Sequence, residues 1–172
     1  GGDGFLCVLD PAVMMVEKSI RLSAQGLRCI ELVKDKLLVG GSDNHIRVVN
    51  PLSLDTEKIL HNAHSNSIFT MWFDGHSILY SGGRDAVLKL WETSTWKEVK
   101  NLPAHWFTIN KIIPVGDNNL VTVSRDKTVR IWNRKDMSLL KSLSLEKGGH
   151  INSVNDVLYF SEQNHFVTCS DD

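Results

Sequence analysis

The chain has 172 residues, enough for one domain with a sizeable core, and its 42% hydrophobic and 23% charged residues are ordinary for a soluble globular protein. A net charge of −1 gives no sign of a nucleic-acid partner, and no apolar run is long enough to span a bilayer. The three cysteines are far apart and form no Cys-x-x-Cys pair, which indicates a reducing compartment rather than a disulfide framework. We therefore expect a cytoplasmic protein with neither a nucleic-acid nor a membrane partner.

Strand patterns and tight turns alternate along the whole chain. The first turn is followed by an alternating strand up to residue 10 and a polar strand that contains a lysine. Two to four strand-like segments then recur around each later turn. In chain order, the predicted strands include those at 16–22, 26–33, 67–73, 77–81, 95–102, 108–113, 119–124, 139–145 and 151–160.

One aspartate recurs at a nearly constant period. The turn aspartates are separated by 40, 42, 41 and 46 residues, and they are Asp3, Asp43, Asp85, Asp126 and Asp172. Apolar residues three and five positions after the first four aspartates predict a strand with one buried face. Four strands in each period of this length are typical of one blade of a β-propeller.

A histidine recurs upstream of the last three aspartates. His64, His105 and His150 precede their aspartates by 21, 21 and 22 residues. Each lies in a loop just before an apolar strand. Each repeating unit therefore contains two recurring polar positions, a histidine and an aspartate, as well as the strands.

These phased segments resemble the WD-repeat (Trp–Asp repeat) β-propeller family. The resemblance covers essentially the whole chain. The motifs that support it most strongly are GGRDAVLKLWE with His64, SRDKTVRIWN with His105, and GGH at 148–150 with TCSDD. It implies an all-β fold, a β-propeller fragment of four-stranded antiparallel blades with half-blades at both ends. The expected units are a half-blade at 1–22, blades at 23–62, 63–103 and 104–147, and a half-blade at 148–172.

Because the sequence begins and ends at turns within a blade, we expect it to be an excerpt of a longer chain that forms a larger ring. Joining the two half-blades would close a ring of four blades, which is smaller than this family usually builds. The remaining blades would then come from the parent chain or from another copy. Both alternatives remain open at this point.

The resemblance also implies a buried hydrogen-bond chain in each complete repeat. It would join the loop histidine, the turn aspartate, a Ser or Thr four residues before that aspartate, and the Trp. The three expected sets are His64, Asp85, Ser81 and Trp91; His105, Asp126, Thr122 and Trp132; and His150, Asp172 and Thr168, without a Trp.

Ser81, Asp85 and His64 are also the residue types of a hydrolase catalytic triad. A nucleophile must be exposed, however, and the same set occurs three times in this chain, so we favour a structural brace over a catalytic site. The repeat of Asp43 departs from the pattern, with Ser23 in place of the histidine and Val49 in place of the Trp. We expect apolar packing to hold that blade, and removal of Asp43 to cost less stability than removal of Asp85 or Asp126.

No metal or cofactor site is expected. His61 and His64 have the spacing of ligands on a helix, but they lie in a loop without a third ligand nearby. The paired glycines precede turns and strands rather than a helix that could bind phosphate.

Three classes of function remain open: a non-catalytic protein-interaction scaffold, which the resemblance favours; a propeller enzyme or small-ligand binder that uses the central channel; and a purely structural module. Trp106 and Phe107 lie in a loop of the expected top face, where Arg84 and Arg125 also project. Aromatic and Arg residues are typical of interaction hot spots, although Trp106 could instead cover a neighbouring blade. The favoured partner is a protein or peptide with acidic and apolar side chains.

Overall fold

The computed structural model describes residues 1–172. It contains sixteen β-strands and one short 3-10 helix, η1 (Leu145–Lys147). The strands form three four-stranded sheets and two two-stranded sheets, and every pairing is antiparallel. The expected fold class, four-stranded antiparallel blades with a half-blade at each end, is confirmed.

Each sheet is built from strands that follow one another in the sequence. The first half-blade contains β1 (Phe5–Asp10) and β2 (Met15–Arg21), and the last contains β15 (Val154–Phe160) and β16 (His165–Ser170). The complete blades contain β3 (Leu27–Val33), β4 (Lys36–Gly41), β5 (Ile46–Val49) and β6 (Thr56–Leu60); β7 (Ile68–Phe73), β8 (Ile78–Gly83), β9 (Val87–Glu92) and β10 (Lys97–Pro103); and β11 (Ile109–Val115), β12 (Asn119–Ser124), β13 (Val129–Asn133) and β14 (Leu139–Leu143).

The recurring aspartate shapes the turn between the second and third strands of a blade. In the complete blades its carboxylate accepts a hydrogen bond from the backbone N–H two residues later, which belongs to His45, Val87 or Thr128. The residue directly after the aspartate has a left-handed backbone in all these turns, with φ of 72° at Asn44, 64° at Ala86 and 72° at Lys127. An Asp side chain that bonds to the backbone two residues on stabilises such a tight turn.

The core lies between neighbouring sheets. Leu79 of β8 and Ile68 of β7 share an apolar cluster with Leu38 and Ile46 of the preceding blade. Gly82 allows the next blade to approach closely, because a Cβ atom there would lie 2.9 Å from the Ile109 side chain. Face-to-face burial of apolar side chains therefore holds consecutive blades together.

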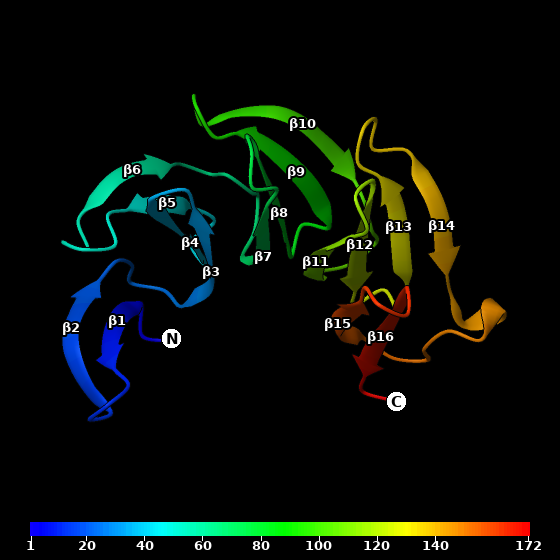
Figure 1. Ribbon diagram of the computed structural model, residues 1–172, viewed down its shortest axis with the longest axis horizontal. Helices are drawn as coiled ribbons and strands as arrows, with labels where there is room; N and C mark the ends of the chain where they lie inside the picture. The colour runs from blue at the N-terminus through cyan, green and yellow to red at the C-terminus, as the bar shows by residue number, and fades with distance from the viewer.

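The five sheets follow one another along an arc (Figure 1). The first strands of successive blades are neighbours, with β3 beside β7, β7 beside β11 and β11 beside β15. The outer strands β6, β10 and β14 lie on the convex side, and the two half-blades flank the open side of the arc (Figure 1). The ring is therefore not closed within this chain.

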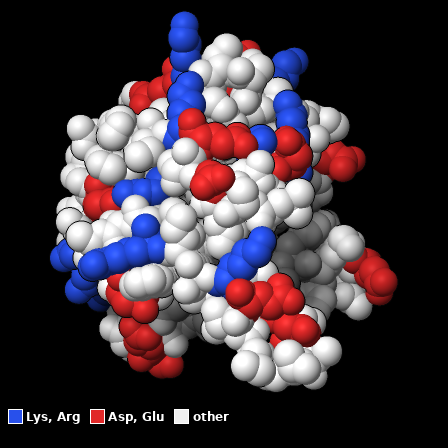
Figure 2. Space-filling model, turned by 90° about the vertical axis from the view of Figure 1, so that its left-hand side faces the viewer, with Lys and Arg blue, Asp and Glu red and all other residues white.

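Charges of both signs are mixed on the surface near the N-terminal end of the arc. Figure 2 shows Lys and Arg side chains interspersed with Asp and Glu over this face. Lys36, for example, forms ion pairs with Asp35 and Glu57. The chain contains no helix that is both long and apolar enough to cross a membrane.

Candidate functional site

The β7–β10 blade contains a buried chain of four polar side chains. The Nδ1 atom of His64 lies 3.0 Å from both carboxylate oxygens of Asp85, and its Nε2 atom lies 2.7 Å from Ser81 Oγ. The Trp91 indole N–H donates to the same Ser81 oxygen over 2.9 Å. This chain joins the loop before β7 to the second and third strands of its blade.

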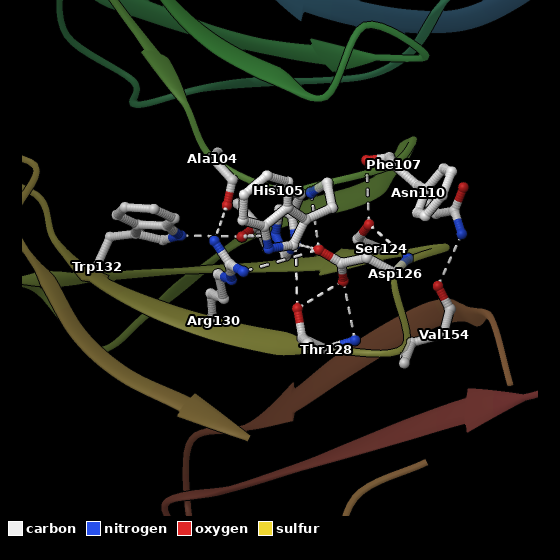
Figure 3. Close-up of polar contacts among 12 residues, drawn as sticks. Ala104, His105, Phe107, Asn110, Ser124, Asp126, Thr128, Arg130, Trp132 and Val154 are labelled. Atoms are coloured by element: carbon white, nitrogen blue, oxygen red, sulfur yellow. Dashed lines mark hydrogen bonds and ion pairs between the residues drawn. The ribbon is translucent and has the colours of Figure 1, made fainter. Parts of the chain in front are cut away.

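The β11–β14 blade repeats the arrangement, as Figure 3 shows. His105 Nδ1 lies 2.9 Å from Asp126 Oδ2, and His105 Nε2 lies 2.7 Å from Thr122 Oγ1. The Trp132 indole donates to Thr122 Oγ1 over 2.9 Å. Thr replaces Ser without a change in the order of the contacts.

The last half-blade has three of the four groups. His150 Nδ1 lies 3.0 Å from Asp172 Oδ1, and His150 Nε2 lies 2.7 Å from Thr168 Oγ1. Both His150 and Asp172 are partly exposed, whereas His64 and His105 are buried. The set without a Trp is therefore the most open to water.

The hydrogen-bond partners of His64 indicate which ring nitrogen donates and which accepts. An ionised carboxylate only accepts hydrogen bonds, so Nδ1 of His64 must donate to Asp85. Ser81 Oγ already accepts from Trp91, which leaves its own hydrogen free to donate to His64 Nε2. With Nδ1 donating to the carboxylate and Nε2 accepting from the hydroxyl, every group in the chain has a hydrogen-bond partner.

This arrangement suits a structural brace rather than a nucleophile. Ser81 and Thr122 are completely buried, and a substrate carbonyl could not reach either hydroxyl without displacing the Trp indole. A catalytic serine or threonine must be accessible to its substrate. The contacts of Ser81, Asp85 and His64 are therefore those of a structural brace.

The sequence predicted that apolar packing, rather than polar contacts of the turn aspartate, would hold the β3–β6 blade. This prediction is wrong for Asp43, whose carboxylate has polar partners of its own. Arg47 donates two hydrogen bonds to the Asp43 carboxylate, at 3.1 and 2.5 Å, and Ser23 Oγ donates a third at 2.6 Å. Burial alone would raise the pKa of the Asp43 carboxyl, but the hydrogen bonds from Arg47 and Ser23 outweigh it and lower the pKa to about 2. An ion pair replaces the histidine at this turn.

The sequence carries a signal for this ion pair in the residue four positions after the aspartate. That residue is Arg47 in one blade and Arg130 in another, and Arg130 lies 3.8 Å from Asp126 Oδ2. Lys89 occupies the same position after Asp85, but it pairs with Glu98 instead. A cation four residues after the turn aspartate is therefore a possible partner, and it becomes the principal one where the histidine is missing.

The top face, onto which the histidine loops and aspartate turns open, brings the expected binding residues together. The backbone N–H groups of Ala104 and His105 both donate to Ala86 O, so the turn after Arg84 lies against the loop of the next blade. On the other side of that loop, Arg125 N donates to Thr108 O. The loop with Trp106 and Phe107 therefore lies between the turns that carry Arg84 and Arg125.

Both aromatic side chains of this loop are exposed, Trp106 by 82% and Phe107 by 60%. The backbone N–H of Trp106 donates to Asp126 Oδ2 over 3.0 Å. The carbonyl oxygen of Phe107 accepts a hydrogen bond from Ser124 Oγ. The loop backbone is thus tied to its blade while the aromatic rings face solvent.

The inner side of the arc contains a polar hollow of about 360 Å³ between the first strands of the blades. Lys111 Nζ lies 3.8 Å from Asp156 Oδ1 there, and partial burial raises the pKa of the Glu31 carboxyl. The structure has no group of three or more His, Cys, Asp or Glu side chains arranged to hold a metal ion. The hollow is lined by a mixture of charged, amide and apolar side chains.

Replacing Ser81 with Ala tests the brace. The change strands the Trp91 indole N–H and one ring nitrogen of His64 in the core, and we expect the free energy of unfolding to fall by about 1–3 kcal/mol. Urea titration of the Ser81→Ala variant measures this loss. Ser94→Ala, at an exposed site, is the matched control and should change stability by less than about 0.5 kcal/mol. Equal stabilities of the two variants would contradict the brace.

Replacing Asp43 with Ala should destabilise the protein at least as much as Asp85→Ala, which reverses the expectation from the sequence. The change leaves the buried Arg47 guanidinium without its carboxylate, and breaking such a pair typically costs about 3–5 kcal/mol. Denaturant titration of the double variant Asp43→Ala/Arg47→Leu should show partial recovery, because the unpaired charge is gone. A double variant less stable than Asp43→Ala would refute this explanation.

Acid should weaken the fold in two steps. Burial lowers the pKa of the His105 imidazole, so the unfolded chain takes up a proton near its ordinary pKa of about 6.5 before the folded protein does. Stability is thus complete above that pKa and declines as the pH falls below it, by up to about 1.4 kcal/mol per pH unit for each proton taken up. The hydrogen bonds from histidine outweigh burial and lower the pKa of the Asp85 and Asp126 carboxyls, which adds a further loss below about pH 4. Urea titrations between pH 7.5 and pH 3 measure both steps, and a constant free energy of unfolding between pH 7 and pH 5 would contradict the first.

Comparison with known proteins agrees with this geometry. Residues 56–92 and 96–133 match the family described as WD domain, G-beta repeat (WD40). The chain is 29% identical over 113 residues to the human kinesin-like protein KIF21A, covering 65% of this chain and 7% of that protein.

In two further relatives, the matched region makes up a larger share of the protein. The chain is 30% identical over 139 residues to the nuclear distribution protein PAC1 of Komagataella phaffii, covering 70% of this chain and 27% of that protein. It is 31% identical over 125 residues to the p21-activated protein kinase-interacting protein 1-like of Gallus gallus, covering 69% of this chain and 32% of that protein. The chain therefore spans less than a third of the length of these relatives. With its matched repeats, its four-stranded blades and its repeated His–Asp–Ser/Thr–Trp geometry, the chain belongs to the WD-repeat family.

Proposed function

We propose that the chain is a non-catalytic protein-interaction scaffold whose partner binds the top face between the β7–β10 and β11–β14 blades. The observation that carries this proposal is the exposure of Trp106 and Phe107 on a loop whose backbone is tied down at both residues. Exposed aromatic side chains on a rigid support can bury a large area on binding at a small cost in entropy. The alternative role of Trp106, covering a neighbouring blade, fits poorly with its exposure of 82%.

The charges around this loop favour an acidic partner group. The side chains of Arg84 and Arg125 are exposed and form no ion pair or hydrogen bond within the chain, whereas Asp85 and Asp126 are already engaged by histidines. A free guanidinium binds a carboxylate through two parallel hydrogen bonds. The proposed partner is therefore a peptide segment that combines acidic and apolar side chains.

The comparisons lend general support to a scaffold. The relative from Gallus gallus is named as a protein that interacts with a kinase, and that role is proposed here only at the level of protein binding. Free thiols at Cys7, Cys29 and Cys169 support a reducing, cytoplasmic location as part of the same proposal. In this proposal, residues 1–172 act as one WD-repeat unit whose ring is completed by further blades.

A peptide-display selection against the immobilised protein tests the proposed surface. We expect enriched peptides to carry Asp or Glu next to apolar residues, and Trp106→Ala and Arg125→Ala each to weaken their binding at least tenfold, because truncating a hot-spot residue costs about 2 kcal/mol or more. Leu52→Ala is the matched control, since Leu52 is equally exposed but lies in a turn at the opposite end of its blade's strands. Folding of each variant is checked by thermal unfolding. Selected peptides that bind Trp106→Ala and Arg125→Ala as tightly as the unmutated protein would refute the top-face site.

A further inference from the structure

Two side chains hold the aromatic loop (residues 104–107) on either side of its exposed rings. Before the rings, the Nη1 atom of Arg130 donates a hydrogen bond to Ala104 O over 2.6 Å (Figure 3). After them, Ser124 Oγ donates to Phe107 O over 3.1 Å. Hydrogen bonds at both ends of so short a segment leave its backbone little freedom to open.

Both side chains are also linked to the turn aspartate of the β11–β14 blade. Ser124 Oγ accepts a hydrogen bond from Asp126 N over 2.9 Å, and Arg130 Nη2 lies 3.8 Å from Asp126 Oδ2. The same Oδ2 atom accepts from the Trp106 backbone N–H. The aromatic loop is therefore held at its first, third and fourth residues by one connected group of side chains.

Neither Arg130 nor Ser124 is available to a partner that binds the rings. Ser124 is completely buried, and the Arg130 side chain is only 17% exposed. Two of the Arg130 nitrogens face Ala104 O and the Asp126 carboxylate, and the third, Nε, is buried. These two side chains can thus affect binding only through the loop.

The neighbouring β7–β10 blade has neither contact. At the positions of the serine and the arginine it has Gly83, which has no side chain, and Lys89, whose Nζ atom donates to Glu98 Oε2 over 2.7 Å. Its corresponding loop carries the small polar residues Ser65 and Asn66 instead of aromatic rings. The two side-chain contacts and the exposed aromatic residues therefore occur together in one blade.

The outer strand explains why the arginine turns toward the loop. Glu98 of β10 lies opposite Trp91, and at the same place in the next blade Leu139 of β14 lies opposite Trp132. The strand β14 contains no acidic residue. A largely buried cation needs hydrogen-bond partners, so Arg130 takes them from the loop carbonyl and the turn instead.

We propose that Arg130 and Ser124 are positioning residues of the top-face site, which hold the aromatic loop in its binding conformation before a partner arrives. The inference rests on the proposed function and adds what sets the strength of that binding. Ordering a loop on binding costs free energy, and a site that is formed only part of the time binds more weakly in proportion. Side chains that the partner never touches should therefore change its affinity.

Hydrogen exchange in the free protein tests the loop directly. Arg130→Lys together with Leu139→Glu recreates the lysine–glutamate pair of the neighbouring blade, which satisfies the cation but removes its contact with the loop. We expect the Trp106 amide to exchange about tenfold faster, because a hydrogen bond from a charged donor is lost. The Ser65 amide, which donates to Asp85 in the same way over 2.9 Å, is the internal reference and should keep its rate.

Affinity is measured for the acidic and apolar peptides of the display selection. The double variant should bind them at least about fivefold more weakly, because its loop is formed for less of the time, while its thermal unfolding matches that of the unmutated protein. A merely structural role would change unfolding and leave the affinity of the folded protein intact.

A second variant and a control complete the test. Ser124→Ala leaves Arg130 in place, and it should change the Trp106 exchange rate and the peptide affinity in the same direction as the double variant. Lys89→Met removes the equivalent cation, which contacts no loop, and it should change neither.

Unchanged Trp106 exchange in both variants would contradict the positioning role, and so would faster exchange with full peptide affinity. If the double variant also exchanges faster at Ser65, it has lost stability as a whole, and Ser124→Ala then decides. A selection that enriches no peptide would contradict the proposed function instead, and hydrogen exchange would still decide whether these side chains hold the loop.

Discussion

The structure depends on keeping a largely buried carboxylate at the turn between the second and third strands of each complete blade. An unpaired buried charge is very costly, so each of these aspartates must collect hydrogen bonds from its surroundings. Asp85 and Asp126 accept from the turn backbone and from a histidine on the preceding loop, and Asp43 accepts from Arg47 and Ser23. One charge thereby joins a loop, two strands and a turn that are about twenty residues apart in sequence.

The same buried charge supports the proposed binding surface. Asp126 binds the backbone N–H of Trp106, so the residue that closes the turn of one blade also positions an exposed aromatic loop. Loops on a rigid scaffold can carry binding residues because their own side chains are not needed for the core. The brace and the proposed hot spot are therefore neighbouring parts of one structure, with the polar groups facing inward and the aromatic rings facing outward.

Between blades the forces are different. The interfaces contain clusters of apolar side chains and closely approaching glycines, together with hydrogen bonds such as those from Ile112 N–H to Thr70 Oγ1 and from the Asn110 amide to Val154 O. Such packing repeats from blade to blade and has no natural end point, so any blade without its neighbour leaves apolar surface exposed.

The sequence alone determined the period, the turn positions and the three histidine-containing sets. Aspartate, histidine and tryptophan at fixed spacings leave few other ways to satisfy their polar groups, and alternating apolar residues fix which strand face is buried. The ion pair of Asp43 with Arg47 was missed, because a side chain four residues away becomes a partner only when the turn and the strand twist bring it back to the carboxylate. The exposure of Trp106 was likewise decided by tertiary structure, since the sequence left open whether its ring would cover a neighbouring blade, and the answer depends on the shapes of packed side chains rather than on their periodic order.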